Sequence, residues 1–147
     1  CLSLLSDTHL GKPVFMMNAD ILTNVNFTQL LDFHLKAKTA ITMCVRNYTH
    51  QIPYGVIRTN NHLIESIDEK PTQVSKVNAG IYIVNPETIT NLQQGKNLDM
   101  PALINSELEK NSSAVSVFPI HEYWLDIGQI ADYQKAQVDF ISNFSND

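Results

Sequence analysis

The chain has 147 residues, of which 44% are hydrophobic and 17% are charged. These proportions are typical of a globular protein and exclude a disordered tail, a collagen-like repeat and a coiled coil. The 15 acidic residues outnumber the 10 lysine and arginine residues, so we expect neither a nucleic acid nor an anionic membrane surface as a partner. No apolar run is long enough to cross a bilayer, and the length predicts a single domain, residues 1–147.

The first part of the chain predicts a strand, a helix and a second strand. Residues 14–17 form a continuous apolar run, which is typical of a strand buried on both faces. Asn26 is placed to cap a helix over residues 27–37, whose apolar residues recur at helical spacing. A second β-favouring run covers residues 40–45, so we expect the two strands to pair in parallel through the helical crossover.

The rest of the chain predicts a hairpin, two more strands and three helices. Residues 54–58 and 63–67 indicate an antiparallel hairpin, because two short, partly alternating apolar runs flank a polar turn. A hairpin combined with a parallel pair implies an α/β fold with a mixed sheet. The other expected elements are strands at 77–84 and 114–120, helices at 86–92 and 101–110, and a final helix that starts near Ile130.

Two aspartates follow expected strands. Asp20 comes just after the run at 14–17, and Asp126 ends a short apolar segment before Gly128. Ligands of open α/β sheets collect at strand carboxyl ends, and Mg²⁺ is typically held by one or two carboxylates together with substrate phosphates. Both aspartates can therefore converge on one cation. The competing interpretation is that Asp20 only caps the following turn. Trp124, two residues before Asp126, is expected to be a core aromatic residue.

Lys70 and two glycines are candidates on local grounds. Lys70 stands between Glu69 and Pro71, and the proline ends the second strand of the hairpin. A lysine beside a rigid turn can bind a phosphate as a point charge, whereas the alternative is a strand exit exposed to solvent. Gly55 and Gly80 lie within expected strands, where glycine often marks the close approach of a ligand or another backbone.

Six segments, taken in order along the chain, carry a family resemblance. They are Asn18-Ala19-Asp20, Tyr54-Gly55-Val56, Glu69-Lys70-Pro71, Asn78-Ala79-Gly80-Ile81-Tyr82, Asp99-Met100-Pro101 and Tyr123-Trp124-Leu125-Asp126-Ile127-Gly128 with Asp132-Tyr133. This set resembles the sugar-1-phosphate nucleotidyltransferases, in particular the mannose-1-phosphate guanylyltransferase branch and its bacterial sugar-nucleotide relatives. The resemblance extends from about residue 2 to residue 140.

The resemblance implies a Rossmann-like mixed sheet flanked by helices and a Mg²⁺-dependent reaction. In that reaction a phosphate oxygen of a sugar-1-phosphate attacks the α-phosphate of a nucleoside triphosphate of the GTP or UTP type, and pyrophosphate leaves. Such chemistry needs positioning and charge neutralisation more than a covalent catalyst. By resemblance, Asp20 and Asp126 are the catalytic residues that hold the metal, and Lys70 is the catalytic cation on the sugar-1-phosphate. The sugar-facing residues that it implies are Tyr54, Gly55, Glu69, Asn78 and Gly80.

The family's glycine-rich loop, whose Arg and Lys bind the triphosphate, has no counterpart here, since Gly11-Lys12-Pro13 has no glycine-rich stretch before it. We therefore expect a partial domain, the carboxyl-terminal two-thirds of the family's catalytic domain, which is inactive alone and whose intact form makes a nucleotide sugar for a surface polysaccharide. Without the family's first strand, residues 14–17 would form a bare edge, so we expect a homodimer or other self-association. Cys1 and Cys44 form no CxxC pair, and we expect both to be small core residues in a reducing, cytoplasmic compartment.

Three alternatives stay open at this point. A non-catalytic regulatory relative could keep the fold, although it would have no need of both Asp20 and Asp126. A sugar-phosphate-binding module would bind its ligand independently of Mg²⁺. A GT-A glycosyltransferase would normally carry an Asp-x-Asp metal motif, and Asn18-Ala19-Asp20 does not match that motif.

Overall fold

The computed structural model describes residues 11–92 and 98–144 of the chain. The chain divides into two compact units: unit 1 comprises Cys1–Val45 and Asn78–Asp147, and unit 2 comprises Arg46–Val77. The single domain expected from the length stays a prediction beside this division.

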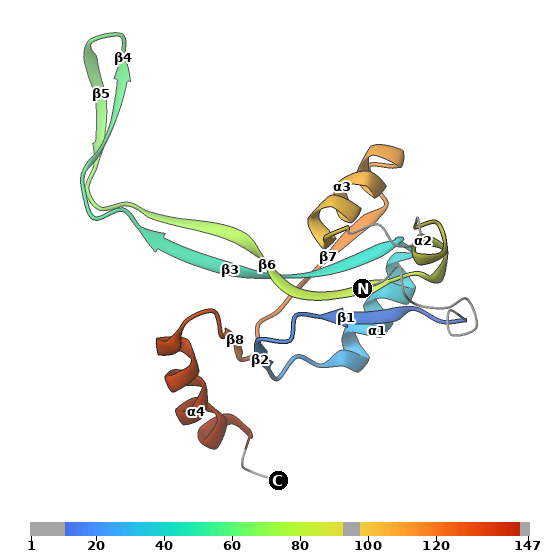
Figure 1. The fold of residues 1–147 in the computed structure, drawn as a ribbon. Coiled ribbons are helices and arrows are strands. Elements are labelled where there is room, and N and C mark those ends of the chain that lie inside the picture. Colours follow the sequence, from blue (N-terminus) through green and yellow to red (C-terminus); the bar gives the residue numbers. More distant parts are fainter. Residues whose placement is uncertain (1–10, 93–97, 145–147) are drawn as a thin grey trace. The chain divides into compact units, whose positions relative to one another are not determined.

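A four-stranded mixed sheet forms the centre of unit 1. Its strand order is β1 (Val14–Met17), β6 (Thr72–Val84), β3 (Ile41–Gln51) and β7 (Val115–Pro119), as Figure 1 shows. β1 runs antiparallel to β6, and β3 runs parallel to β7, so the predicted α/β fold with a mixed sheet is confirmed. The predicted pairing of the first two strands with each other is wrong, because β6 lies between β1 and β3.

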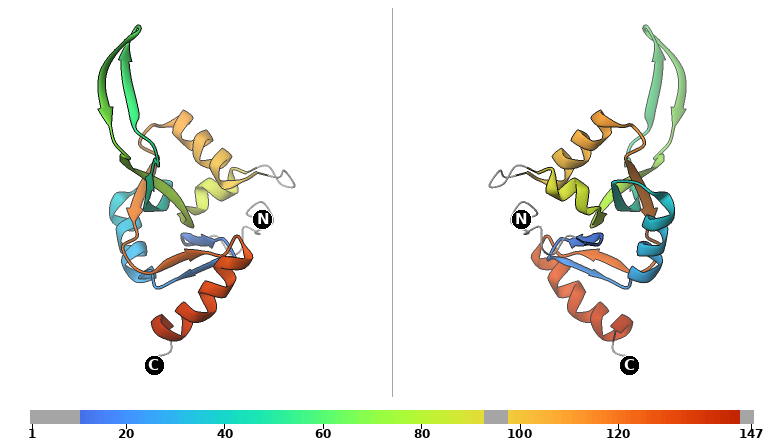
Figure 2. Two further views of the ribbon diagram at one scale, coloured as in Figure 1. Left: turned by 90° about the vertical axis from the view of Figure 1, so that its left-hand side faces the viewer. Right: turned by 90° about the vertical axis from the view of Figure 1, so that its right-hand side faces the viewer.

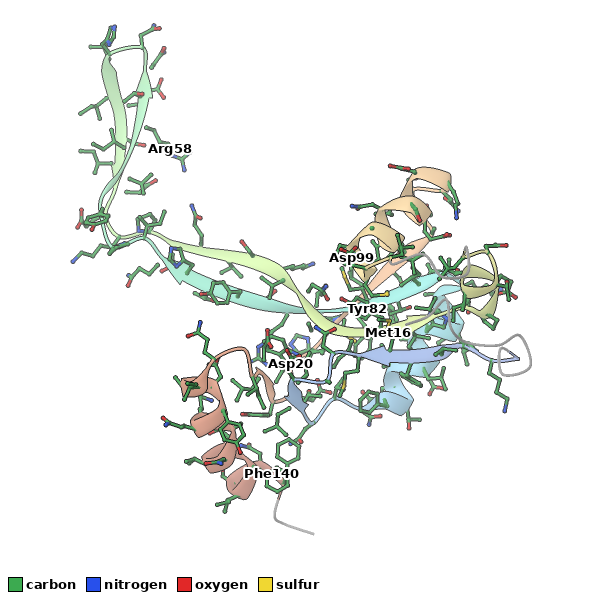
Figure 3. All side chains as sticks on the ribbon, in the orientation of Figure 1. Met16, Asp20, Arg58, Tyr82, Asp99 and Phe140 are labelled. Atoms are coloured by element: carbon green, nitrogen blue, oxygen red, sulfur yellow. The ribbon has the colours of Figure 1, made fainter. Side chains whose placement is uncertain are left out.

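β1 is an edge strand of this sheet, since β6 is its one neighbour among the described strands. Phe15 and Met17 are 40% and 44% exposed and alternate with the half-buried Val14 and Met16. Met16 faces its cross-strand partner Tyr82 in the register of β1 and β6 (Figure 3). The prediction that residues 14–17 are buried on both faces is therefore wrong: one face packs on the core and the other lies at the surface.

Helices cover both faces of the sheet (Figures 1 and 2). α1 (Phe27–Ala37) lies on one face, and α2 (Pro86–Thr90) and α3 (Met100–Lys110) lie on the other. Side chains alternate along β6, so each layer receives every second residue of that strand. The buried residues of the α1 layer are Val25, Leu30, Cys44, Ala79, Ile81, Ile83 and Ile120, and those of the α2–α3 layer are Ile41, Tyr82, Val84, Ile89, Met100, Leu103 and Ile104.

α1 has the bounds that the sequence predicts. Oδ1 of Asn26 accepts a hydrogen bond from the backbone N–H of Gln29 at 3.0 Å, which is the expected N-cap. On the buried face of the helix, Nδ1 of His34 lies 2.7 Å from Oγ1 of Thr42, and Nε2 lies 3.0 Å from Oδ1 of Asn85. Both ring nitrogens therefore have hydrogen-bond partners inside the core, and these bonds offset the cost of removing the polar side chain from water.

A two-stranded ribbon and the last helix complete unit 1. β2 (Ile21–Thr23) pairs antiparallel with β8 (Trp124–Asp126), and α4 (Ile130–Phe144) packs against the ribbon. The hydroxyl of Thr23 donates to the carbonyl of Tyr123 at 2.8 Å, and the hydroxyl of Tyr123 donates to Asp139 of α4 at 2.6 Å. In the described part of the chain, no helix combines the length and the apolar character that a membrane crossing requires.

Unit 2 consists of the hairpin β4 (Val56–Asn60) and β5 (Leu63–Asp68) together with the adjoining ends of β3 and β6. The predicted hairpin is confirmed, and its turn contains Asn61 with a left-handed φ of 51°. The register shifts between Arg58 and Thr59, and Nε of Arg58 lies 3.6 Å from a carboxylate oxygen of Asp68 on the opposite strand. Both side chains of this ion pair are largely exposed, so it adds little stability.

Candidate functional site

The pairing of β2 with β8 brings together two aspartates that are far apart in sequence. Ile21 lies directly opposite Asp126, and the backbone N–H of Ile127 donates to the carbonyl of Asp20 at 2.8 Å. Figure 3 shows Asp20 where the chain turns from β1 into β2. The sequence predicts two carboxylates at neighbouring strand ends, and the backbones of these two residues are adjacent.

The directions of the two side chains have different origins. In an antiparallel ladder, directly opposed residues point to the same face and successive residues alternate. Asp126 therefore shares a face with Ile21 and Trp124, and both of these pack against the α1 layer. Asp20 lies in the turn before β2, outside the alternation of the ladder. That turn decides whether the two carboxylates converge, and their convergence stays a prediction.

The donor atoms at this place fit a hard cation. Asp20 and Asp126 are both exposed, and carboxylate oxygens are the ligands that Mg²⁺ prefers. Within residues 11–92 and 98–144, no group of three or more His, Cys, Asp or Glu side chains could hold a metal ion. Two carboxylates suit a cation that keeps its remaining positions for water and substrate phosphates, rather than a cage made entirely of protein ligands.

Residues 78–80 belong to β6 and lie next to β2 and β8. Gly80 has a φ of +69°, and a Cβ built there would lie 2.6 Å from Cδ1 of Ile21 and 2.8 Å from Nδ2 of Asn18. The close neighbours of this glycine are therefore side chains of the chain itself, and the predicted approach of a ligand stays a prediction. Oδ1 of Asn78 accepts the N–H of Gly80 at 2.9 Å, and its Nδ2 donates to the hydroxyl of Tyr82 at 2.6 Å.

Unit 2 contains the other four candidate residues. A Cβ built at Gly55 would lie 3.0 Å from Oε2 of Glu69, so these two sugar-facing candidates are neighbours. Tyr54 is 75% exposed. Lys70 has a left-handed φ of 45°, and its carbonyl accepts a hydrogen bond from the side chain of Gln51 at 3.2 Å. Pro71 thus follows a backbone in a restricted conformation, as a rigid turn requires, while the binding roles of all four residues stay predictions.

Two residues that the sequence did not assign to the site bond directly to residues 78–80. The backbone N–H of Asn18 donates to the carbonyl of Gly80 at 2.9 Å, and the indole N–H of Trp124 donates to the carbonyl of Ala79 at 2.9 Å. Trp124 is half-buried against the α1 layer, as expected of a core aromatic residue. No sequence signal could have identified these bonds, because both acceptors are backbone carbonyls.

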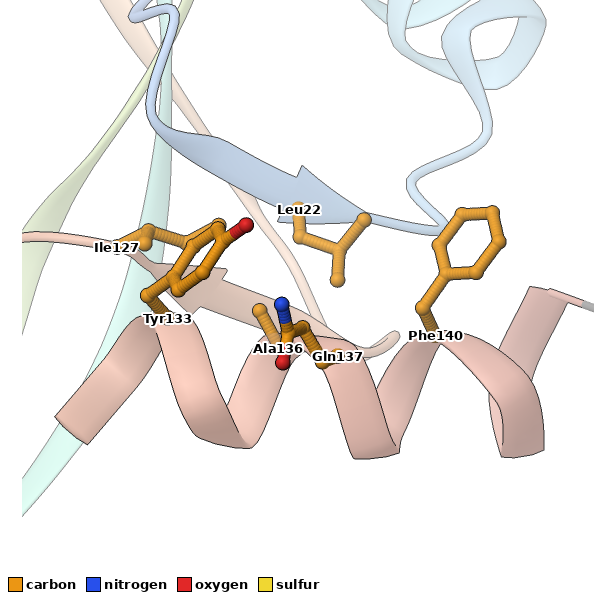
Figure 4. Close-up of a pocket in the computed structure, with 6 residues that line it drawn as sticks. All are labelled: Leu22, Ile127, Tyr133, Ala136, Gln137 and Phe140. Carbon is orange, nitrogen blue, oxygen red and sulfur yellow. The ribbon is translucent and has the colours of Figure 1, made fainter. Parts of the chain in front are cut away.

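An apolar pocket of about 360 Å³ lies between α4 and the β2–β8 ribbon (Figure 4). Its lining residues are Leu22, Ile127, Tyr133, Ala136, Gln137 and Phe140. An apolar lining cannot neutralise a phosphate, so this pocket is not where the predicted substrates would place their charged groups.

Cys44 is a buried free thiol in the α1 layer. Burial raises its pKa to about 12, and the nearby negative charge of Glu122 contributes further in the same direction. A thiol with so high a pKa is not a nucleophile at neutral pH, so the predicted role of Cys44 as a small core residue is confirmed.

Comparison of the sequence with known proteins identifies its family. The Nucleotidyl transferase family model matches residues 2–143. The mannose-1-phosphate guanyltransferase of Debaryomyces hansenii is 30% identical over 142 residues, and that of Candida albicans is 28% identical over 146 residues. These alignments cover 90% and 91% of this chain, and the chain spans 38% of the length of each of these curated relatives.

A solved structure has a similar fold. The crystal structure of HddC from Yersinia pseudotuberculosis complexed with GMP-PN superimposes with a TM-score of 0.63 at 19% identity, covering 95% of this chain and 60% of that chain. At this identity the likeness shows the fold, which is that of the predicted Rossmann-like mixed sheet. With the family model matched over nearly the whole sequence, the chain belongs to the nucleotidyl transferase family.

Proposed function

We propose that the protein to which these residues belong joins a nucleoside triphosphate and a sugar-1-phosphate into a nucleotide sugar and releases pyrophosphate. The main support for this proposal is the β2–β8 pairing, because it places the backbones of Asp20 and Asp126 side by side. The chain's membership of the nucleotidyl transferase family gives this arrangement its interpretation. Support for the substrate class comes from the curated relatives, which are mannose-1-phosphate guanyltransferases.

The proposed reaction transfers a nucleotidyl group in one displacement. A phosphate oxygen of the sugar-1-phosphate forms a bond to the α-phosphorus, and the bond from that phosphorus to the bridging oxygen of the β-phosphate breaks. The electron pair of the broken bond leaves with pyrophosphate. Since both partners are anionic, the protein has to hold them in line and offset their mutual repulsion.

The roles of the residues follow from their charge and position. We propose that Asp20 and Asp126 hold Mg²⁺, which would neutralise phosphate charge when bound. Lys70, whose backbone is restricted by its left-handed φ and by Pro71, binds the phosphate of the sugar-1-phosphate. The sugar itself is bound by five residues, which are Tyr54, Gly55, Glu69, Asn78 and Gly80.

The proposal extends to the substrates and the location. We propose a triphosphate of the GTP or UTP type, with GTP favoured by the guanyltransferase relatives, and a product used for a surface polysaccharide. A cytoplasmic location is supported by the buried free thiol of Cys44, because a reducing compartment keeps thiols free.

We further propose that these 147 residues alone transfer no nucleotidyl group. They contain no glycine-rich loop with basic residues that could orient a triphosphate. Loss of orientation can remove several orders of magnitude of rate even when metal ligands are intact. A pyrophosphate-release assay on the 147-residue chain that rose above background would contradict this.

Self-association is proposed from the edge position of β1. The strand has one neighbour among the described strands, and Phe15 and Met17 are substantially exposed on it. An edge with unpaired backbone groups and exposed apolar side chains favours pairing with another chain, such as a second copy. Light scattering over a dilution series should detect a concentration-dependent dimer, and a monomer at high concentration would contradict the proposal.

The deciding experiment uses the full-length protein. Pyrophosphate release is measured with mannose-1-phosphate and GTP or UTP, with and without Mg²⁺, for the wild type and Asp126→Asn. We expect transfer that requires Mg²⁺ and is lost in the variant, while circular dichroism shows an intact fold. Binding of mannose-1-phosphate that is independent of Mg²⁺, without any transfer, would instead identify a non-catalytic sugar-phosphate-binding relative.

A further inference from the structure

Two consecutive carbonyl groups of β6 connect the two chain segments that lead to the aspartates. The carbonyl of Gly80 accepts the backbone N–H of Asn18 at 2.9 Å, and the carbonyl of Ala79 accepts the indole N–H of Trp124 at 2.9 Å. Asn18 and Trp124 each lie two residues before one of the aspartates. A single short backbone segment, residues 78–80, is therefore bonded to both of the chain segments that lead to the proposed metal ligands.

This segment is held in one conformation by its own contacts. The side-chain oxygen of Asn78 accepts a hydrogen bond from the backbone N–H of Gly80, and its side-chain nitrogen donates to the hydroxyl of Tyr82. Tyr82 as a residue is only 2% exposed. The left-handed φ of Gly80 and the close approach of Ile21 leave no space for a Cβ at that position. Residues 78–80 are thus a fixed reference against which β8 can be positioned.

We propose that Trp124 is a positioning residue for Asp126. Its indole N–H, bonded to the carbonyl of Ala79, holds β8 in register against residues 78–80 and so sets where the carboxylate of Asp126 lies. The proposal rests on the proposed function, in which Asp126 holds the metal. Ala79 is fully buried, so loss of the donor would leave a buried carbonyl without this partner.

Trp124 could instead contribute only through the packing of its ring. Two replacements distinguish this packing role from the positioning role of the indole N–H. Trp124→Phe removes the N–H together with part of the ring. Replacement of Trp124 by 3-benzothienylalanine keeps the two-ring shape and removes only the donor. The matched control is Phe118→Leu, because Phe118 packs in the same α1 layer, 5.4 Å from the ring of Phe33, and takes no part in the bonds to residues 78–80.

The first measurement is amide hydrogen exchange of Ile127, whose N–H donates to the carbonyl of Asp20. Protection of Ile127 is taken relative to that of Ile81, so that a general loss of stability cancels. We expect about 10-fold faster relative exchange in both Trp124 variants, the equivalent of one lost hydrogen bond, and no change in Phe118→Leu. Unchanged relative protection of Ile127 in both Trp124 variants would overturn the positioning role.

The second measurement is binding of Mn²⁺ to the 147-residue chain, followed by electron paramagnetic resonance. Residues that orient a metal ligand typically contribute about 10–100-fold in metal affinity, so we expect a loss of that size in both Trp124 variants. Asp126→Asn should abolish the binding. If Asp126→Asn weakens Mn²⁺ binding and the Trp124 variants do not, the positioning role is wrong and the proposed metal site stands.

The two proposals can fail separately. If Mn²⁺ affinity is the same in the wild type and Asp126→Asn, the metal role in the proposed function is wrong. The exchange of Ile127 then still decides whether the indole N–H of Trp124 positions β8, because that measurement needs no metal.

Discussion

The two units of the chain are stabilised in different ways. Unit 1 contains both buried layers of the sheet. Residues 46–77 are all described, and none of them is buried. Ile57 and Ile67 lie directly opposite each other in the hairpin and are 53% and 59% exposed. Unit 2 therefore depends on strand pairing and turn geometry, and a two-stranded hairpin is only marginally stable by itself.

The units also differ in charge. Residues 46–77 contain four lysine or arginine residues and three acidic residues, while the rest of the chain contains six basic and twelve acidic residues. An anionic ligand is therefore favoured by the local charge of unit 2, which contains Lys70, and disfavoured by the charge of the rest of the chain. The proposed ligands of Lys70 and of the two aspartates, a phosphate and a cation, would thus meet regions of opposite charge balance.

Hydrogen exchange should show the largest difference between the units. We expect amides of β6 in the core, such as Ile81 and Ile83, to exchange at least about a thousandfold more slowly than the paired amides of β4 and β5, since local opening costs little where nothing is buried. Mass spectrometry of overlapping peptides, or NMR, would measure this. Equal protection in the two regions would mean that the hairpin of unit 2 is covered in solution.

Matched truncations of isoleucine sharpen the same contrast. Ile81 is fully buried in the α1 layer, whereas Ile67 is 59% exposed in β5. Ile81→Ala should lower the free energy of unfolding by about 2–5 kcal/mol, because it removes buried apolar surface and leaves a cavity. Ile67→Ala should change it by only about 0.5 kcal/mol. Urea titrations monitored by circular dichroism would test the pair, and a comparable loss in Ile67→Ala would show that unit 2 has a core of its own.

Glycine replacements compare the units at the backbone. Gly80→Ala in unit 1 should destabilise the chain by about 1–2 kcal/mol from the left-handed conformation alone, and by more because of the contacts with Ile21 and Asn18. At Gly55 in unit 2, the nearest atom to a new Cβ is the end of the flexible Glu69 side chain, so Gly55→Ala should cost less than about 1 kcal/mol. Thermal unfolding of the two variants would rank them, and the reverse order would contradict this account of Gly80.

Local signals explain which elements the sequence could predict. The bounds of α1 follow from the Asn26 cap and the apolar spacing, both of which are local. The strands predicted at 40–45 and 77–84 are longer in the structure, Ile41–Gln51 and Thr72–Val84. The sequence did not predict the added residues because most of them are polar and exposed and show no apolar pattern. The position of β6 between β1 and β3 depends on contacts distant in sequence, which no local pattern contains.

The candidate site also has features that the sequence could predict and features that it could not. Asp20 and Asp126 could be predicted as neighbours, because charged residues at strand ends are visible in the sequence and ladder pairing then places their backbones together. The bonds from Asn18 and Trp124 to the carbonyls of Gly80 and Ala79 could not, because every residue has a backbone carbonyl and an acceptor of this kind has no sequence signature.

The smallest expected effect concerns α4, the part of unit 1 that most resembles unit 2 in exposure. Ile130, Val138 and Ile141 of this helix are 80%, 69% and 70% exposed. Part of its attachment is polar: the carboxylate of Asp139 accepts a hydrogen bond from the hydroxyl of Tyr123, and Lys135 of α4 itself donates to the same carboxylate. The bond from Lys135, followed by that from Tyr123, holds the pKa of Asp139 below its ordinary value.

A carboxyl group whose pKa is lower in the folded state stabilises the fold above its unfolded pKa, and this contribution is lost as the pH falls through the folded pKa. Between about pH 5 and pH 2, the wild type should therefore lose slightly more stability than Asp139→Asn, which has no such carboxyl group. Urea midpoints across this range would measure the difference, with Asp32→Asn, at an exposed position of α1, as the control. If Asp139→Asn and the wild type lose stability in parallel, the polar contacts of Asp139 contribute nothing to the attachment of α4, and its few apolar contacts with the ribbon suffice.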